Sequence, residues 1–120
     1  MIERDVNFCK GKIKGFVAIS RKYWDKGKLT TNNEKILLKG KKSTFEIAIN
    51  EIKNIELVRR RTFKVIKIIM HYDDSYHISC IPDKTPAPGG DTMEWIAEIT
   101  GDVIAKNENL YNALQKLLNL

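Results

Sequence analysis

The chain has 120 residues, of which 42% are hydrophobic and 30% are charged, and its formal net charge is +6. This length and composition are typical of one globular domain, residues 1–120, and exclude two independent cores or a fully disordered chain. The sequence contains no run of ~20 apolar residues that could span a bilayer. Residues 1–10 lack the apolar run of a signal peptide, so we expect a cytoplasmic protein.

The positive charge is concentrated in the first part of the chain. Residues 1–72 carry 18 Lys and Arg against 7 Asp and Glu, whereas residues 73–120 carry 3 against 8. Such an asymmetry can steer an anionic partner toward one side of a fold. The alternative is that the lysines only keep a small sheet soluble and protect its edges.

Short runs of alternating apolar residues, separated by turn residues, predict about seven strands between residues 13 and 81. The predicted strands cover residues 12–19, 27–31, 35–39, 44–49, 56–61, 63–72 and 76–80. Residues 20–26 are polar and read as a loop that contains Tyr23 and Trp24. Because each run meets the next through a short turn, we expect an antiparallel meander.

The run 44–49 has the cleanest alternation, with Phe45, Ile47 and Ile49 on one face. Ile52 and Ile55 then lie three residues apart, which indicates a single helical turn or a bulge before the next strand. In the run 63–72 the alternation predicts a core face that consists of Ile66, Ile68, Met70 and Tyr72.

Residues 82–90 contain all three prolines and form a predicted loop, and residues 91–120 show helical spacing. Asp91 and Glu94 fit the start of a first helix, which Gly101 ends or kinks. A second, short amphipathic helix is predicted over 109–120. Its apolar stripe packs either on the chain's own sheet or on a second copy, and consists of Leu110, Tyr111, Leu114, Leu117 and Leu118.

The order of these signals resembles the pattern of PH-like and GRAM-like domains. The residues that carry the resemblance are Gly27, Lys28, Leu29, Thr30 and Thr31, then Ile36, Leu37 and Leu38, then Phe45, Ile47, Ile49, Ile52 and Ile55. Trp95 is similar to the tryptophan in the closing helix of many PH domains, and a weaker similarity points to the PH-like unit of archaeal chemotaxis adaptors. The resemblance implies an α+β, mainly β fold, in which a strongly bent antiparallel sheet or barrel is capped by a C-terminal helix.

PH-like domains bind phosphoinositides, peptides or other proteins, and a subset uses a basic strand-loop-strand motif. The counterpart here surrounds the first inter-strand loop and consists of Lys12, Lys14, Arg21, Lys22, Lys26 and Lys28. The densest cation cluster lies further along the chain, and consists of Arg59, Arg60, Arg61 and Lys64. Because alternate strand residues face opposite sides, only part of that second cluster can meet one ligand.

We expect a non-enzymatic binding or adaptor module whose basic surface engages an acidic protein or an anionic membrane. The first alternative is a nucleic-acid-binding protein, in which Phe63, Tyr72 and Tyr76 stack on bases unless they pack in the core. The second alternative is a structural oligomerisation domain that uses the C-terminal apolar stripe.

Catalytic chemistry has little support in the sequence. His71 and His77 are the only histidines, and the motifs that hold zinc or calcium are missing, so we expect no metal and no cofactor. We expect both histidines on the strand surface. Cys80, His77 and Asp73 contain the atoms of a nucleophile, base and acid, but Cys80 alternates with Ile78 and reads as a core residue. We therefore expect no catalytic residues.

Overall fold

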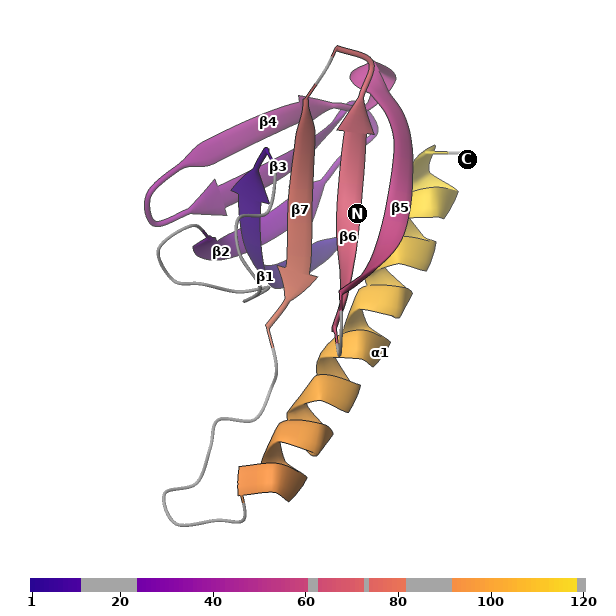
Figure 1. The fold of residues 1–120 in the computed structure, drawn as a ribbon. Helices are drawn as coiled ribbons and strands as arrows, with labels where there is room; N and C mark the ends of the chain where they lie inside the picture. Colours follow the sequence, from indigo (N-terminus) through magenta and orange to yellow (C-terminus); the bar gives the residue numbers. More distant parts are fainter. Residues whose placement is uncertain (12–23, 61–62, 73, 82–91, 119–120) are drawn as a thin grey trace.

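The computed structural model describes residues 1–11, 24–60, 63–72, 74–81 and 92–118, with the side chains at 60, 63 and 92–100 excepted. It contains seven strands, one short 3-10 turn and one helix in an α+β arrangement (Figure 1). The elements are β1 (Glu3–Lys10), β2 (Asp25–Thr31), β3 (Lys35–Gly40), β4 (Thr44–Ala48), η1 (Ile49–Glu51), β5 (Ile52–Arg60), β6 (Phe63–Met70), β7 (Ser75–Cys80) and α1 (Thr92–Leu118).

The strands form one strongly curled sheet in the order β4-β3-β2-β1-β7-β6-β5, and every neighbouring pair is antiparallel. The predicted antiparallel, helix-capped sheet is thus confirmed, but the simple meander is wrong. β4 and β5 follow each other in sequence and yet are not paired, whereas the first strand pairs with the last. Two meanders, β1 to β4 and β5 to β7, are joined by the β1–β7 ladder.

The strand β1 was not predicted from the sequence. Its residues alternate between exposed polar side chains and an inward face on which Val6 and Phe8 are fully buried. Two apolar residues give too weak an alternation to stand out, although β1 lies in the middle of the sheet. The predicted strand 12–19 and the predicted loop 82–90 lie outside the described residues. Trp24 and Asp25 belong to the predicted loop 20–26, but both are buried, Trp24 immediately before β2 and Asp25 as its first residue.

The core lies on the concave side of the curled sheet. Ile66, Ile68 and Met70 are buried there as predicted, but Tyr72 is 50% exposed because β6 ends before it. The predicted irregularity before β5 is also confirmed. It takes both predicted forms, since η1 is a single 3-10 turn and a register shift follows between Ile52 and Asn54.

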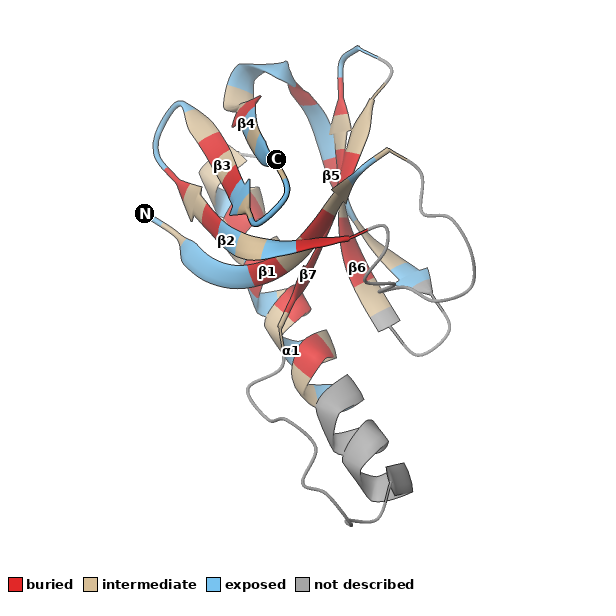
Figure 2. Ribbon diagram, turned by 90° about the vertical axis from the view of Figure 1, so that its left-hand side faces the viewer, coloured by how far each residue is buried: buried red, intermediate tan, exposed pale blue. Residues whose placement is uncertain are grey.

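Helix α1 is continuous from Thr92 to Leu118, so the predicted division into two helices is wrong. Gly101 is exposed and lies within the helix rather than at its end. Leu110 and Leu114 are fully buried in the core cluster, and Tyr111, Leu117 and Leu118 pack partly buried against it. Figure 2 shows buried positions along the described part of α1. The apolar stripe therefore packs on the chain's own sheet, and its two fully buried leucines, Leu110 and Leu114, are not available to a second copy.

Asn107 fixes α1 to the sheet where β6 and β7 separate. Its side-chain oxygen accepts the N–H of Cys80 at 2.7 Å, and its amide nitrogen donates to the carbonyl of Lys64 at 2.7 Å. The same nitrogen also donates to Ser79 Oγ at 3.2 Å. The fully buried Asn107 side chain thus replaces a missing rung of the ladder and satisfies backbone groups that burial would otherwise leave unpaired. Within the described residues, no helix is long and apolar enough to cross a membrane.

Candidate lysine-rich binding site

Five lysines gather at one outer corner of the sheet, which we name the lysine corner. They come from β2, β3 and the turn between β3 and β4, and comprise Lys26, Lys28, Lys39, Lys41 and Lys42. Lys26 and Lys28 are separated by one residue on β2 and therefore share its outer face. Lys28 lies directly opposite Lys39 in the β2–β3 register. All five residues are exposed, so this corner presents several cationic side chains to solvent.

A buried carboxylate, Asp25, holds the turn that presents these lysines. Its Oδ1 accepts the N–H groups of Lys26 at 2.8 Å and Lys41 at 3.1 Å. Its Oδ2 accepts the N–H groups of Lys42 and Ser43, both at 2.8 Å, and the Ser43 hydroxyl at 3.1 Å. The backbone of the turn is therefore fixed by one side chain from a neighbouring strand.

The same hydrogen bonds determine the charge state of Asp25. Burial by itself would raise the pKa of this carboxyl, but the N–H groups of Lys42, Ser43 and Lys26 and the Ser43 hydroxyl outweigh it. The net result is a pKa below the ordinary value of 3.8, so Asp25 is a carboxylate at neutral pH. Its negative charge lies beneath the turn, where it offsets part of the repulsion among the lysines.

Two glycines allow this close packing. A Cβ atom on Gly40 would collide with the Asp25 carboxylate and would lie 2.7 Å from Cζ of Phe8. A Cβ atom on Gly27 would collide with the backbone carbonyl of Lys39. Because backbone and a buried ring cannot move aside cheaply, both positions require a residue without a side chain.

The predicted ligand-binding residues do not form one site. Lys26 and Lys28 belong to the lysine corner, whereas Lys12, Lys14, Arg21 and Lys22 lie outside the described residues. Arg59 is exposed on β5, and nothing is described of the Arg60 side chain or of Arg61. The strand order separates this second cluster from the lysine corner by β1 and β7.

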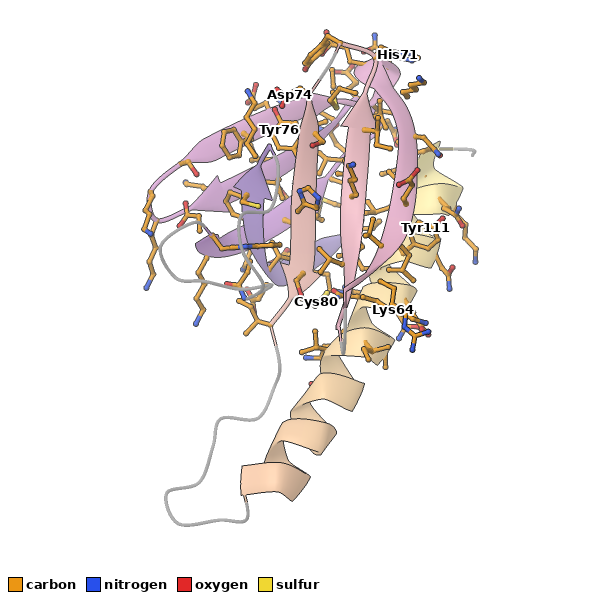
Figure 3. All side chains as sticks on the ribbon, in the orientation of Figure 1. Lys64, His71, Asp74, Tyr76, Cys80 and Tyr111 are labelled. Atoms are coloured by element: carbon orange, nitrogen blue, oxygen red, sulfur yellow. The ribbon has the colours of Figure 1, made fainter. Side chains whose placement is uncertain are left out.

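Lys64 has a structural partner. Its Nζ lies 2.7 Å from Oε1 of Glu108, and this ion pair links β6 to α1 one residue beyond Asn107. Figure 3 shows Lys64 next to α1. Both side chains of this ion pair remain partly exposed, so the pair contributes little to stability. Lys64 nevertheless faces its own helix, and we do not count it in the ligand site.

The sequence reasoning missed three members of the lysine corner, namely Lys39, Lys41 and Lys42. A usable signal was present, because a hairpin between the predicted strands 35–39 and 44–49 places its turn beside residues 26–28. Proximity in sequence instead groups Lys26 and Lys28 with the cations around the first loop. In a sheet, the side chains that form one site are neighbours across adjacent strands and are often far apart in sequence.

The aromatic residues do not form a stacking surface in the described part of the chain. Tyr76 is buried and contacts Phe45 edge to face, with the ring centroids 5.4 Å apart. Tyr72 is exposed but its hydroxyl lies 3.3 Å from Glu51, at the turn between β6 and β7. The Lys10 ammonium lies near the rings of Phe45 and Tyr76 and 3.2 Å from Asp74.

Two of the residues considered for nucleophilic chemistry, Cys80 and His77, lie apart, and Asp73 lies outside the described residues. Cys80 is buried in the core as predicted, whereas His77 lies on the opposite face of β7 by strand alternation. His77 is itself buried, so its predicted surface position is wrong, while His71 is exposed. Burial raises the pKa of the Cys80 thiol to about 11, which disfavours the nucleophilic thiolate.

A hollow of about 450 Å³ borders the lysine corner at Glu3 and lies where the start of β1, the end of β7 and the middle of α1 meet. Its charged lining residues are Glu3, Arg4, Asp5 and Lys106. These two acidic and two basic side chains balance, so the hollow does not share the positive charge of the lysine corner. Among the described residues, no three His, Cys, Asp or Glu side chains gather as metal ligands would.

The comparisons with known proteins support the fold and no activity. No family model matches the chain, and no curated protein matches it. It is similar to a solved structure described as the C-terminal domain of an unknown protein from Leishmania infantum, with a TM-score of 0.63. The match has 12% sequence identity and covers 100% of this chain and 84% of that chain. At that identity the likeness shows a shared fold alone.

Proposed function

We propose that the chain is a non-enzymatic binding module that engages an acidic surface of a partner protein through the lysine corner. The observation that carries this proposal is the convergence of five exposed lysines on a turn that Asp25 fixes from beneath. A rigid, multiply cationic corner attracts carboxylates and loses little conformational entropy of the backbone on binding.

Two features favour a protein partner over an anionic membrane. The exposed large hydrophobic residues in the described chain are Met1 and Tyr72, and neither belongs to the lysine corner. The acidic residues Glu3 and Asp5 lie beside the corner on β1, and Glu3 is 2.9 Å from Lys28. A flat anionic bilayer would repel these carboxylates, whereas a protein surface can match both signs of charge.

We also propose PH-like membership and a cytoplasmic setting. The first is supported by the curled antiparallel sheet and its capping helix, together with the sequence resemblance. The second is supported by Cys9 and Cys80, two free cysteines that belong to opposite faces of their strands. PH-like scaffolds serve many ligands, so the function rests on the lysine corner and not on the fold.

The test measures binding of fluorescent poly-glutamate, of phosphatidylcholine vesicles with and without phosphatidylserine, and of duplex DNA. The test variant combines Lys39→Glu with Lys41→Glu. The matched control combines Lys53→Glu with Lys116→Glu, two exposed lysines elsewhere that give the same change in net charge.

We expect poly-glutamate to bind the test variant at least about tenfold more weakly than the wild type, a change of about 1.4 kcal/mol, and the control within about twofold. Equal losses in both variants would mean that net charge alone drives binding, which contradicts a defined site. Binding to phosphatidylserine vesicles or DNA without binding to poly-glutamate would replace the protein partner by a membrane or a nucleic acid.

A further inference from the structure

The strand β4 ends the sheet beside the lysine corner. It is the last strand in the order of the sheet, and no described strand pairs with its outer side. An edge strand presents unpaired backbone donors and acceptors that can pair with another extended segment. β4 leads directly out of the turn that carries Lys41 and Lys42, so this edge and the lysine corner form one continuous surface.

The hydrogen-bond pattern shows which residues of β4 face outward. The N–H of Gly40 donates to the carbonyl of Ser43, and the N–H of Ile49 donates to the carbonyl of Glu34. Bonded and non-bonded pairs alternate in an antiparallel ladder, so Phe45 and Ile47 face β3 between these two ends. The backbone groups of Thr44, Glu46 and Ala48 therefore point away from the sheet.

The side chains around this edge define what a new strand must carry. On the inner side, Phe45 and Ile49 are only partly buried, so apolar residues of an added strand could cover them. On the outer side, Lys39 lies opposite Thr44 and Lys35 lies opposite Ala48. Acidic residues that pair with Thr44 and Ala48 would thus come within reach of lysines on the next strand.

A second copy of this chain fits the edge poorly. Glu46 is the middle one of the three outward-facing residues and lies 3.1 Å from Lys35. Two β4 edges paired antiparallel about their centres would place one Glu46 opposite the other, and like charges directly opposite destabilise a strand pair. The edge is therefore protected against self-pairing but remains open to a segment with a different charge pattern.

We propose that the acidic partner adds an extended segment to the edge of β4. Two acidic residues lie opposite Thr44 and Ala48, and an uncharged residue lies opposite Glu46. The two remaining residues between the acids are apolar, lie opposite Phe45 and Ile47, and cover the partly buried Phe45. This inference rests on the proposed function and specifies the form in which the partner's carboxylates reach the lysines. Backbone pairing gives affinity, and the two acidic positions give register.

The probe is a synthetic peptide with the sequence Thr-Glu-Val-Thr-Val-Glu-Thr, acetylated and amidated. One control peptide has Lys in place of both Glu residues. A second keeps every side chain but carries N-methyl groups on the central Thr and on one Glu, which removes backbone donors needed for strand pairing. Binding to the full chain is followed by amide NMR and by hydrogen exchange.

We expect the acidic peptide to slow hydrogen exchange of the Thr44, Glu46 and Ala48 amides by at least about tenfold at saturation, because these N–H groups become paired. The Lys peptide and the N-methylated peptide should each bind at least about tenfold more weakly. Equal binding of the acidic and N-methylated peptides would overturn strand addition, while the lysine corner could still bind poly-glutamate.

A pair of variants tests the same edge from the side of the protein. Glu46→Pro removes an outward N–H without touching the ladder to β3, whereas Glu46→Gln removes the charge and keeps the N–H. Loss of peptide binding in Glu46→Pro, with binding kept in Glu46→Gln, is the expected result. Undiminished peptide binding in Glu46→Pro would overturn the inference. If Glu46→Pro does not fold, the comparison of the acidic and N-methylated peptides on the wild-type chain tests strand addition by itself. If poly-glutamate also fails to bind the wild type, the proposed function itself falls.

Discussion

At the scale of single residues, Asp25 does the most to shape the lysine corner. One carboxylate accepts four backbone N–H groups and a hydroxyl while the chain turns from β3 to β4. Hydrogen bonds to an ionised acceptor are stronger than those between neutral groups. The order of the turn therefore depends on the charge of a side chain that the ligand would not touch.

We expect Asp25→Asn to lower the free energy of unfolding by about 2 kcal/mol at neutral pH, because an amide cannot accept all of these bonds. The pKa of Asp25 is lowered by folding, so its stabilisation is present above pH 3.8 and is lost as the pH falls through the folded-state pKa. Urea unfolding of both proteins, followed at several pH values, should show the difference shrinking in acid. Asp5→Asn, which changes an exposed carboxylate on β1, is the control and should change stability little.

The residues of the site were only partly predictable. The sequence placed Lys26 at the end of a predicted loop and Lys28 on the predicted strand 27–31, and the structure places both on β2 in the lysine corner. Asp25 gave no such signal, since a single acidic residue among lysines looks like an ordinary surface charge. Its role follows from the turn at Lys41 to Ser43, which is distant in sequence and adjacent only through the β2–β3 register.

At the scale of secondary-structure elements, α1 shows how packing overrides a local signal. Gly101 suggested a helix end, because glycine is common where the backbone adopts a positive φ. The helix continues through it, and the buried residues Val103, Leu110 and Leu114 follow at helical spacing. Their burial offsets the cost of about 1 kcal/mol that glycine imposes within a helix.

We expect Gly101→Ala to raise the free energy of unfolding by about 0.5–1 kcal/mol. A Cβ at this exposed position meets nothing within 4 Å, so the gain comes from the reduced backbone entropy of the unfolded chain. Urea unfolding measures it. Gly40→Ala is the matched comparison and should destabilise, because its Cβ collides with Asp25 and Phe8. A loss of stability in Gly101→Ala would instead mean that the helix bends at this residue.

The strands differ in how well the alternation of apolar residues in the sequence predicts them. β4 and β6 carry regular apolar alternation, and their predicted positions agree with the structure within two residues at each end. β1 has the charged residues Glu3, Arg4 and Asp5 in its first half. Its composition therefore does not indicate that it lies in the middle of the sheet. Periodicity reports which face is buried, and it does not report which strands are neighbours.

At the scale of the whole molecule, Asn107 connects the helix to β6 and β7, two of the three strands that the helix mainly contacts. Its three hydrogen bonds reach the N–H of Cys80, the carbonyl of Lys64 and the hydroxyl of Ser79. If the helix left the sheet, these groups of β6 and β7 would lose their hydrogen-bond partner. Helix and sheet should therefore unfold together in one transition.

We expect Asn107→Leu to lower the free energy of unfolding by about 3 kcal/mol, since two buried backbone groups lose their partners. In a Trp95→Phe background, in which the fluorescence reports the buried Trp24 alone, the variant should still unfold in one step, with far-ultraviolet circular dichroism and fluorescence changing together. Asn112→Leu, an exposed change on the same helix, is the control. Separate transitions in the two signals would show that α1 detaches before the sheet unfolds.

The ladder between β1 and β7 has a consequence for how the chain reaches its native state. Val6 pairs with Cys80, so the two ends of the strand region must meet before the sheet is complete. Closing so long a loop costs entropy that local hairpins do not face, and contacts of this separation slow folding. During synthesis on the ribosome, the hairpins of β2, β3 and β4 can form early. Val6 and Phe8 lack their β7 partners until the seventh strand has been synthesised, so their burial is completed late.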